Sequence, residues 1–433
     1  MLDRRSRIRR LLETYPWLIM AMFVIGFSIL GLVMVRLDQE LEIDPAPSRL
    51  WLYGGSPDAA ISVLSAIASS AITVAGVVFS ATFVTMQLAS SQYTPRVVKA
   101  LSRRWYLHIV LGMFLGSFTF SLLVLRSVRP PEADPAAMFV PVLSVSLAII
   151  IAIASVGVLG FYAIYGMKSL EPTFLINSAA DQTRSLLQRS LIASRSVRSV
   201  GSLNTDPPPD MTTAAIRATR AGFLQLMQFE RLLAAAIRDD VTINVTANIG
   251  NYVFPGEVLA IVWPSERISQ ETERQLLKAL WLGDERTSEQ DIEFGFRRVA
   301  DIMLKSISAA INDPTTAEYC MNTLGDLVIL VANEPEPQRY LADQTDTVRV
   351  IWEPEPFARC VHTAFDQLRF YVKNDTHLAI HALSTMRRVH ALVPASARPV
   401  IESIASTFQQ TVCEHLDTDE DRRTLDRAAS WLG

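Results

Sequence analysis

Four stretches of this chain contain no Asp, Glu, Lys or Arg, and each is long enough to cross a lipid bilayer as a helix. They are residues 17–35, a run within 59–88, residues 105–125 and a run within 136–167. A helix rises about 1.5 Å per residue, so about 20 apolar residues span a hydrocarbon core that is about 30 Å thick. The sequence therefore predicts an α-helical integral membrane domain with four spans over residues 1–167.

The composition of the 433 residues agrees with this prediction. Half of the residues are hydrophobic and the mean hydropathy is +0.24, a value that soluble globular chains seldom reach. The charge is uneven, because residues 1–167 hold 13 Lys+Arg against 9 Asp+Glu, so the total of −4 leaves −8 for residues 168–433. The two parts of the chain are therefore expected to have different surroundings.

Basic residues indicate which side of the membrane is cytoplasmic, because Lys and Arg are retained there. Nine of them precede the first span or separate the second span from the third: Arg4, Arg5, Arg7, Arg9, Arg10, Arg96, Lys99, Arg103 and Arg104. The loops on the other side hold four: Arg36, Arg49, Arg126 and Arg129. Both termini are therefore predicted to be cytoplasmic, and the acidic second part of the chain is predicted to lie in the cytosol.

The second span carries a stripe of polar residues. Thr73, Ser80 and Gln87 recur every seven residues, which is two helical turns. Ser62 and Ser69 lie within about 40° of Thr73 on a helix that turns about 100° per residue, so all five share one face. We interpret this polar stripe as a pore-lining face, where hydroxyl and amide groups replace part of the hydration of an ion or small polar solute.

Helix packing is a second interpretation of the same stripe, because small and hydroxylated residues let membrane helices approach closely. Ala66 and Gly76 on this span, and the Gly112-x-x-x-Gly116 motif on the third, favour packing. The two interpretations are compatible in a homo-oligomer, since four helices leave little room for a lumen inside one copy. The spans contain no carboxylate or arginine at membrane depth, which disfavours a proton-driven pump.

The second part of the chain is predicted to be mainly helical with a small β-module. Residues 168–210 are expected to form a helical stalk and a linker, and residues 211–433 a cytosolic α+β domain. Hydrophobic periodicity predicts a helix over 214–238, two or three short strands over 241–262, and further helices from residue 271 onward.

The Asn312-Asp313-Pro314 sequence marks a junction between two predicted helices. Pro314 disfavours a helical conformation at Asp313 and suits the first turn of the next helix, which Asp313 is placed to cap. The alternative is a polar site for a small ligand or ion, formed by Asn312 and Asp313 at the helix N-terminus with Arg297 one helix back.

The sequence contains no P-loop, no dinucleotide-binding glycine pattern and no nucleophile elbow. His377 and His381 lack a recognisable third ligand, and Cys320, Cys360 and Cys413 lack metal-ligand spacing. We therefore expect no enzymatic activity, no metal and no other cofactor. Basic residues are scattered among acidic ones in the second part, so no nucleic-acid partner is expected.

Six segments of the chain carry a family resemblance. They are residues 71–80 and 88–96 in and after the second span, and residues 251–260, 285–287, 291–295 and 311–317 in the second part. Together they resemble a bacterial family of membrane proteins known as domain of unknown function 2254. The resemblance extends from the first span to about residue 390. It implies a four-span protein of the bacterial inner membrane with a cytosolic C-terminal domain, and it implies no activity.

The pattern differs from the family at one place. A histidine pair tends to follow the fourth span in its members, whereas Tyr165-Gly166-Met167-Lys168 stands there in this chain, so no role of those histidines is transferred. From these observations we expect an oligomeric channel or passive transport pathway with a cytosolic regulatory domain. The alternative is a membrane-anchored sensor or scaffold whose cytosolic domain binds a ligand or partner.

Overall fold

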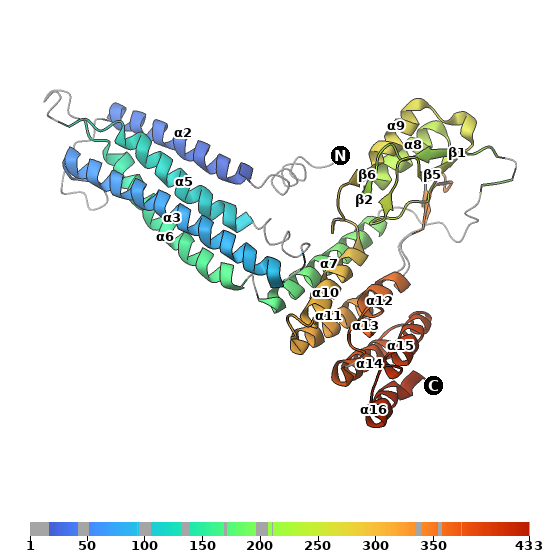
Figure 1. Ribbon diagram of the computed structural model, residues 1–433. Helices are drawn as coiled ribbons and strands as arrows, with labels where there is room; N and C mark the ends of the chain where they lie inside the picture. The colour runs from blue at the N-terminus through green and yellow to red at the C-terminus, as the bar shows by residue number, and fades with distance from the viewer. Residues whose placement is uncertain are drawn as a thin grey trace. The chain divides into compact units, whose positions relative to one another are not determined.

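The structure is a computed structural model of the 433-residue chain (Figure 1). It describes residues 17–41, 52–92, 94, 105–130, 139–168, 171–195, 207–209, 211–334, 340–353, 357–373 and 375–432. The chain divides into two compact units, Met1–Glu171 and Pro172–Gly433. The first unit is helical, and the second combines helices with two small sheets.

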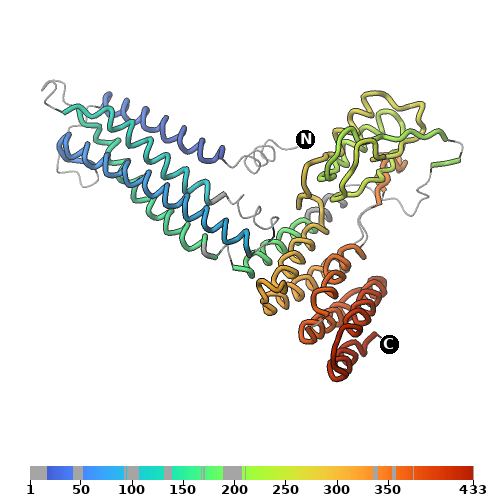
Figure 2. The backbone as a smooth tube through the Cα atoms, viewed as in Figure 1, coloured from blue at the N-terminus to red at the C-terminus, as the bar shows by residue number. Residues whose placement is uncertain are grey.

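Four long apolar helices form most of the described part of the first unit, and they run side by side (Figure 2). They are α2 (Trp17–Leu41), α3 (Pro57–Gln92), α5 (Trp105–Leu125) and α6 (Val142–Lys168). Each contains a stretch that is long and apolar enough to cross a membrane, and α5 packs against the other three helices. The prediction of four apolar helices is therefore confirmed by their length and composition.

Two glycines on α5 let α2 approach closely. A Cβ atom at Gly112 would lie 3.0 Å from Cβ of Phe23, and one at Gly116 would lie 2.9 Å from Cγ of Phe27. The two phenylalanine rings stack along α2 with centroids 6.2 Å apart, so they cover both glycines. The Gly-x-x-x-Gly motif of the third span is thus a helix-packing site within one copy of the chain.

Large side chains fill the space between the four helices. Leu64 and Phe120 belong to one buried cluster, and Phe114 belongs to a second cluster, closer to the C-terminal ends of α3 and α6. The hydroxyl groups of Thr82 on α3 and Tyr162 on α6 add a hydrogen bond of 2.9 Å. The interior of the first unit is therefore a packed core.

A buried carboxylate on α2 holds the start of α6. Asp38 accepts hydrogen bonds from the backbone N–H groups of Leu143 at 2.8 Å and Ser144 at 2.9 Å, and from the Ser144 hydroxyl at 2.5 Å. The first N–H groups of a helix have no partner within it, so a carboxylate there stabilises the helix start. Accordingly α6 begins at Val142, inside the predicted run 136–167.

The second unit begins with α7 (Pro172–Arg195), followed by a region of strands and short helices. Its elements are β1 (Ala214–Arg217), β2 (Gly222–Met227), α8 (Phe229–Asp239), β3 (Thr242–Val245), β4 (Tyr252–Val253), β5 (Val258–Trp263), η2 (Ser265–Arg267), α9 (Gln270–Ala279) and β6 (Leu280–Gly283).

The rest of the unit is mainly helical. Its elements are α10 (Ile292–Ser306), α11 (Pro314–Asn333), β7 (Tyr340–Ala342), β8 (Val348–Trp352), α12 (Phe357–Phe365), α13 (Leu368–Tyr371), α14 (Thr376–Leu392), η3 (Ala395–Ala397), α15 (Arg398–Cys413), α16 (Asp419–Ala429) and η4 (Ser430–Leu432). The prediction of a mixed, mainly α second part is confirmed.

The strands form two sheets that share one apolar core. The larger sheet has the order β1-β5-β3-β8-β7, in which only β3 and β8 run parallel among the described strands. The smaller sheet has the antiparallel order β4-β2-β6. Buried side chains from both sheets and from α8 and α9 form a single cluster.

The predicted helix over 214–238 is wrong in its first half. β1 and β2 occupy most of residues 214–227, and the helix α8 covers only 229–239. Leu224 and Met227 of β2 are spaced like the buried face of a helix, but pairing with β4 and β6 places them in a sheet. The strands predicted within 241–262 are β3, β4 and β5. The strands β7 and β8 were not predicted, and β6 lies where a helix was expected, because pairing with β2 places it in the smaller sheet.

The helix α7 packs against α10 and α11. Gly295 of α10 lies directly against Thr183 of α7, where the Cβ atom of any larger residue would collide with the Thr183 side chain. Arg184 of α7 forms an ion pair of 2.5 Å with Asp326 of α11. The helix that follows α6 in the chain is therefore an integral part of the second unit.

Replacing Gly116 with Leu should destabilise the first unit, because Phe27 already occupies the space that the new side chain needs. Overpacking of this kind costs about 1–3 kcal/mol. The matched control is Gly26→Leu on α2, where nothing lies within 4 Å of the added Cβ atom. Thermal stability in detergent should fall for the first variant only, and equal stability of the two would contradict this packing.

Candidate functional site

The helix α3 has a buried face and an exposed face. Ala68, Ala71 and Ala75 are buried against the rest of the first unit. All five residues of the polar stripe are exposed: Ser62, Ser69, Thr73, Ser80 and Gln87. The structure thus brings the predicted pore-lining residues together on one face, and this face points away from the interior of a single copy.

Small residues extend the exposed face of α3. Ala66 is exposed, and nothing lies within 4 Å of a Cβ atom added at Gly76. The Thr73 hydroxyl donates to the backbone carbonyl of Ser69 at 2.7 Å, which leaves its oxygen free to accept. The face therefore combines close-approach positions with polar groups, and it differs from the Gly112 and Gly116 face of α5, which α2 covers.

The Asn312-Asp313-Pro314 junction has the geometry of a helix start. One Asp313 oxygen accepts from the Thr316 backbone N–H at 3.0 Å, and the other accepts from the Thr316 hydroxyl at 2.6 Å. Asn312 is exposed and has a φ of 49°, a left-handed conformation that Asn adopts more readily than most residues. The predicted capping role of Asp313 is confirmed, and α11 begins at Pro314.

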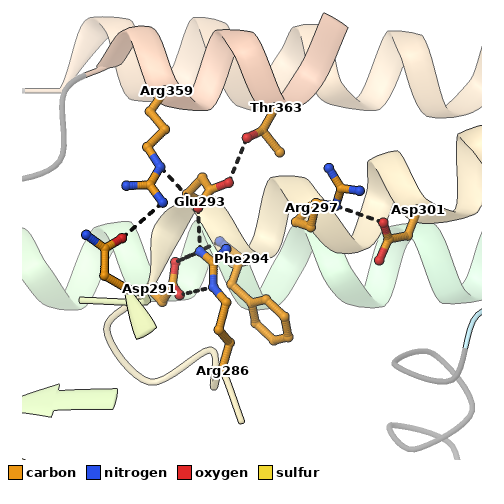
Figure 3. A network of polar contacts seen from close by, with 9 residues as sticks. Arg286, Asp291, Glu293, Phe294, Arg297, Asp301, Arg359 and Thr363 are labelled. Carbon is orange, nitrogen blue, oxygen red and sulfur yellow. Dashed lines mark hydrogen bonds and ion pairs between the residues drawn. The ribbon is translucent and has the colours of Figure 1, made fainter. Parts of the chain in front are cut away.

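The third residue of the predicted polar site has partners elsewhere. Arg297 pairs with Asp301 on its own helix at 2.9 Å (Figure 3). It also donates to Gln367 Oε1 at 2.8 Å. Arg297 and Asp313 therefore have separate partners among the described residues. A ligand site formed by Arg297, Asn312 and Asp313 stays a prediction.

A network of buried charges lies at the start of α10 (Figure 3). Arg286 binds both oxygens of Asp291, through Nε at 2.7 Å and Nη2 at 2.8 Å, and its Nη2 also donates to Glu293 at 2.5 Å. Asp291 in addition caps α10, because it accepts from the Phe294 backbone N–H at 2.8 Å. One arginine thus joins the loop before α10 to the carboxylate that caps the helix and to a carboxylate of its first turn.

The same network reaches α12 and the turn before β4. Glu293 accepts from the Thr363 hydroxyl at 2.7 Å and lies 3.6 Å from Nε of Arg359 (Figure 3). Arg359 also donates to Asn251 Oδ1 at 3.1 Å. Gly250 has a φ of +85°, and a side chain there would collide with Asp291, so its backbone closes over the ion pair. The network therefore connects the β-module to the helical part of the second unit.

Burial and pairing shift the pKa values of these groups. Burial lowers the pKa of Arg286, but the hydrogen bonds and charges of Asp291 and Glu293 outweigh this and raise it. Burial raises the pKa of Glu293, but hydrogen bonds from Arg286 and Thr363 reverse the direction and lower it. At Asp291 burial is the larger effect, so the pKa of that carboxyl is raised.

Sequence reasoning missed this network, although residues 285–287 and 291–295 were among the segments that carry the family resemblance. A signal was present, since Asp291 and Glu293 follow Arg286 at five and seven residues. Arg359 could not be included, because it lies on a helix more than sixty residues later. Two guanidinium groups lie beside two carboxylates here. This arrangement is suited to holding the β-module in a fixed position on the helical part of the second unit.

The described residues contain no group of three or more His, Cys, Asp and Glu side chains that could hold a metal ion. His377 Nε2 lies 2.8 Å from Oε1 of Glu318 on α11. This pair joins α14 to α11 at the surface of the second unit.

The apolar helices define the class to which this chain belongs, that of membrane proteins. The chain belongs to the family described as "Predicted membrane protein (DUF2254)", whose model matches residues 14–388. The resemblance drawn from the sequence segments is thereby confirmed.

Two uncharacterized mycobacterial proteins are similar to almost the whole chain. One is from Mycobacterium bovis and one from Mycobacterium tuberculosis, and each is 26% identical over 99% of this chain and 82% of the relative. No solved structure matches the chain. These relatives carry no assigned activity, so functional inference depends on the geometry of the chain itself.

Replacing Glu293 with Gln should destabilise the second unit, because Arg286 would lose one of its two carboxylate partners and Arg359 would lose the charge that it faces at 3.6 Å. Breaking a buried ion pair costs about 3 kcal/mol, or a fall in the unfolding midpoint of roughly 6–12 °C in a domain of this size. Circular dichroism during heating of the detergent-purified protein measures this shift.

The control for this prediction is Glu402→Gln. The Glu402 side chain is 49% exposed in its pair with His390, whereas that of Glu293 is 7% exposed. An exposed pair contributes less than about 1 kcal/mol, so this variant should unfold close to the wild-type temperature. Equal shifts in the two variants would contradict a stabilising role for the buried network.

Proposed function

We propose that this protein is a non-enzymatic homo-oligomer that forms a passive pathway for an ion or small polar solute across the bacterial inner membrane. The supporting observation is that the polar stripe of α3 lies on an exposed face. Facing lipid, these hydroxyl and amide groups would find no partner beyond their own helix. Facing each other across an assembly of copies, they can line a water-filled path.

The pathway is proposed between copies because side chains fill the interior of each one. Phe114 and Phe120 of the central helix α5 are buried among the helices of one copy. On the outside, Ala66 and Gly76 leave room for the α3 helix of a neighbour. Small residues at such positions favour close helix contact in membranes.

The second unit is proposed to be cytosolic and to regulate the pathway. Residues 169–171 separate α6 from α7 along the chain. α7 is joined to α11 by the Arg184–Asp326 ion pair and by a hydrogen bond from the Tyr319 hydroxyl to Asn177 at 2.8 Å. A change in the packing of the second unit can therefore act on the end of α6 through a short connection.

The proposed orientation predicts that a reporter protein fused after residue 433 is cytosolic. The reason is that nine basic residues precede the first span or lie between the second and third spans, on the side predicted to be cytoplasmic. A Cys at position 44 should react with an impermeant thiol reagent added from outside. As a control, a Cys in the 96–104 loop should react only after the membrane is opened. Labelling of that loop in intact cells would reverse the orientation.

Substitutions of Thr73 test the proposed pathway. Leu at this position should reduce flux, because an apolar constriction excludes water, whereas Ser should preserve it because a hydroxyl remains. A dry helix contact predicts a different pattern: Thr73→Leu would cost about 1–3 kcal/mol through overpacking, and Thr73→Ala would be nearly harmless. Flux in proteoliposomes and oligomer size are measured on the same three variants.

The control for these variants is Ile72→Leu, which changes an exposed residue of α3 outside the polar stripe. It should leave both flux and oligomer size unchanged. A wild-type protein that passes no ion or small solute, while remaining oligomeric, would contradict the pathway. That result would favour a membrane-anchored sensor or scaffold in which α3 only holds the copies together.

A further inference from the structure

The outer face of the three-stranded sheet β4-β2-β6 is aromatic. One face of this sheet lies in the core, with Leu224, Val253 and Leu282 buried. Successive strand residues point to opposite faces, so the other face carries Phe223 and Tyr252, which are direct cross-strand partners, and Trp281. Phe254 follows directly after β4. We name these four residues, Phe223, Tyr252, Phe254 and Trp281, the aromatic face.

Three of the four side chains are exposed, and Phe223 is partly buried. The ring centroids of Phe223 and Tyr252 lie 5.1 Å apart, and those of Tyr252 and Phe254 lie 5.2 Å apart, both in edge-to-face geometry. Tyr252 is 45% exposed, Trp281 53% and Phe254 64%. The outer face of an antiparallel sheet is ordinarily polar, and contiguous exposed apolar surface marks a site of interaction.

Two arginines flank the aromatic face. Arg217 donates to the backbone carbonyl of Gly256 at 2.8 Å, in the turn that carries Phe254. Arg220 donates to the carbonyl of Leu282, next to Trp281 on β6. Neither arginine has a carboxylate partner among the described residues. Each guanidinium group is therefore held in place by the backbone and keeps donors for an anionic oxygen.

We propose that the aromatic face docks on the surface of the lipid bilayer, with its rings at the level of the headgroups and Arg217 and Arg220 on lipid phosphates. Trp and Tyr are enriched at this level of a membrane because one side of the ring is apolar and the other polar. Guanidinium groups bind phosphate oxygens by charge-assisted hydrogen bonds. The inference needs only a membrane-embedded chain and does not depend on a transport pathway.

Two further observations favour a membrane over a second copy of the chain. The second unit follows α6 closely in sequence, so the bilayer is always at high effective concentration and a weak contact suffices. In a symmetric dimer the same face would meet itself. That contact would gather four guanidinium groups without carboxylate partners, whereas lipid phosphates neutralise them.

The test is spin-label accessibility on the full chain in lipid nanodiscs of phosphatidylethanolamine and phosphatidylglycerol. Phe254→Cys carries the label in a Cys413→Ser background, because Cys320 and Cys360 are buried. The control is Leu392→Cys, since Leu392 is an apolar residue at the end of α14 with a matching exposure of 62%. The ratio of collisions with oxygen to collisions with a water-soluble nickel chelate reports contact with lipid.

The expected ratio is severalfold higher at position 254 than at position 392. It should fall to the control value when Arg217→Gln and Arg220→Gln are combined, but not with Arg274→Gln, an exposed arginine on α9. Equal ratios at 254 and 392 would overturn the docking, and an unchanged ratio in the double variant would overturn the phosphate contacts. Spin–spin broadening at 254 that disappears on dilution with unlabelled protein would identify a second copy as the occupant and overturn the proposal.

Discussion

The hydrocarbon core of a bilayer offers no hydrogen-bond partner, and the described part of the first unit meets the requirement that such surroundings would impose. Its backbone satisfies itself within helices, and Asp38 is buried only where two backbone N–H groups and the Ser144 hydroxyl meet it. Thr73 donates to its own helix at the carbonyl of Ser69. Internal hydrogen bonding does not explain why five polar residues of α3 form one stripe. This stripe lies on a face that no other described part of the first unit covers.

The sequence predicted the four long apolar helices well because absence of charge over about 20 residues is a local property. It also showed that the polar stripe shares one face of a helix, since that follows from periodicity. It could not show whether the face points into the unit or away from it, because this depends on which side α5 and α6 cover. The capping of α6 by Asp38 was likewise hidden, since Ser144 is more than a hundred residues away.

In the second unit, sequence patterns predicted structure correctly where the residues at a helix start determine it by themselves. Asp313 and Pro314 predicted the cap and the first turn of α11. Sequence patterns failed for β2, because its apolar spacing fits a helix as well as a strand. Only pairing with β4 and β6 decides between the two. The network around Glu293 and the aromatic face both combine residues from separate strands and helices, so only the folded chain displays them.

Cysteine accessibility along α3 in the native membrane tests the central claim most directly. Single Cys residues at 69, 73 and 80 occupy the polar stripe, and the exposed residues 72, 79 and 83 lie at least about 80° away from Thr73 around the helix. A wet path predicts that a small water-soluble thiol reagent modifies the first three rapidly and the others slowly, so that reactivity follows one face of the helix. Uniformly slow modification at all six positions would contradict a water-filled pathway along this helix.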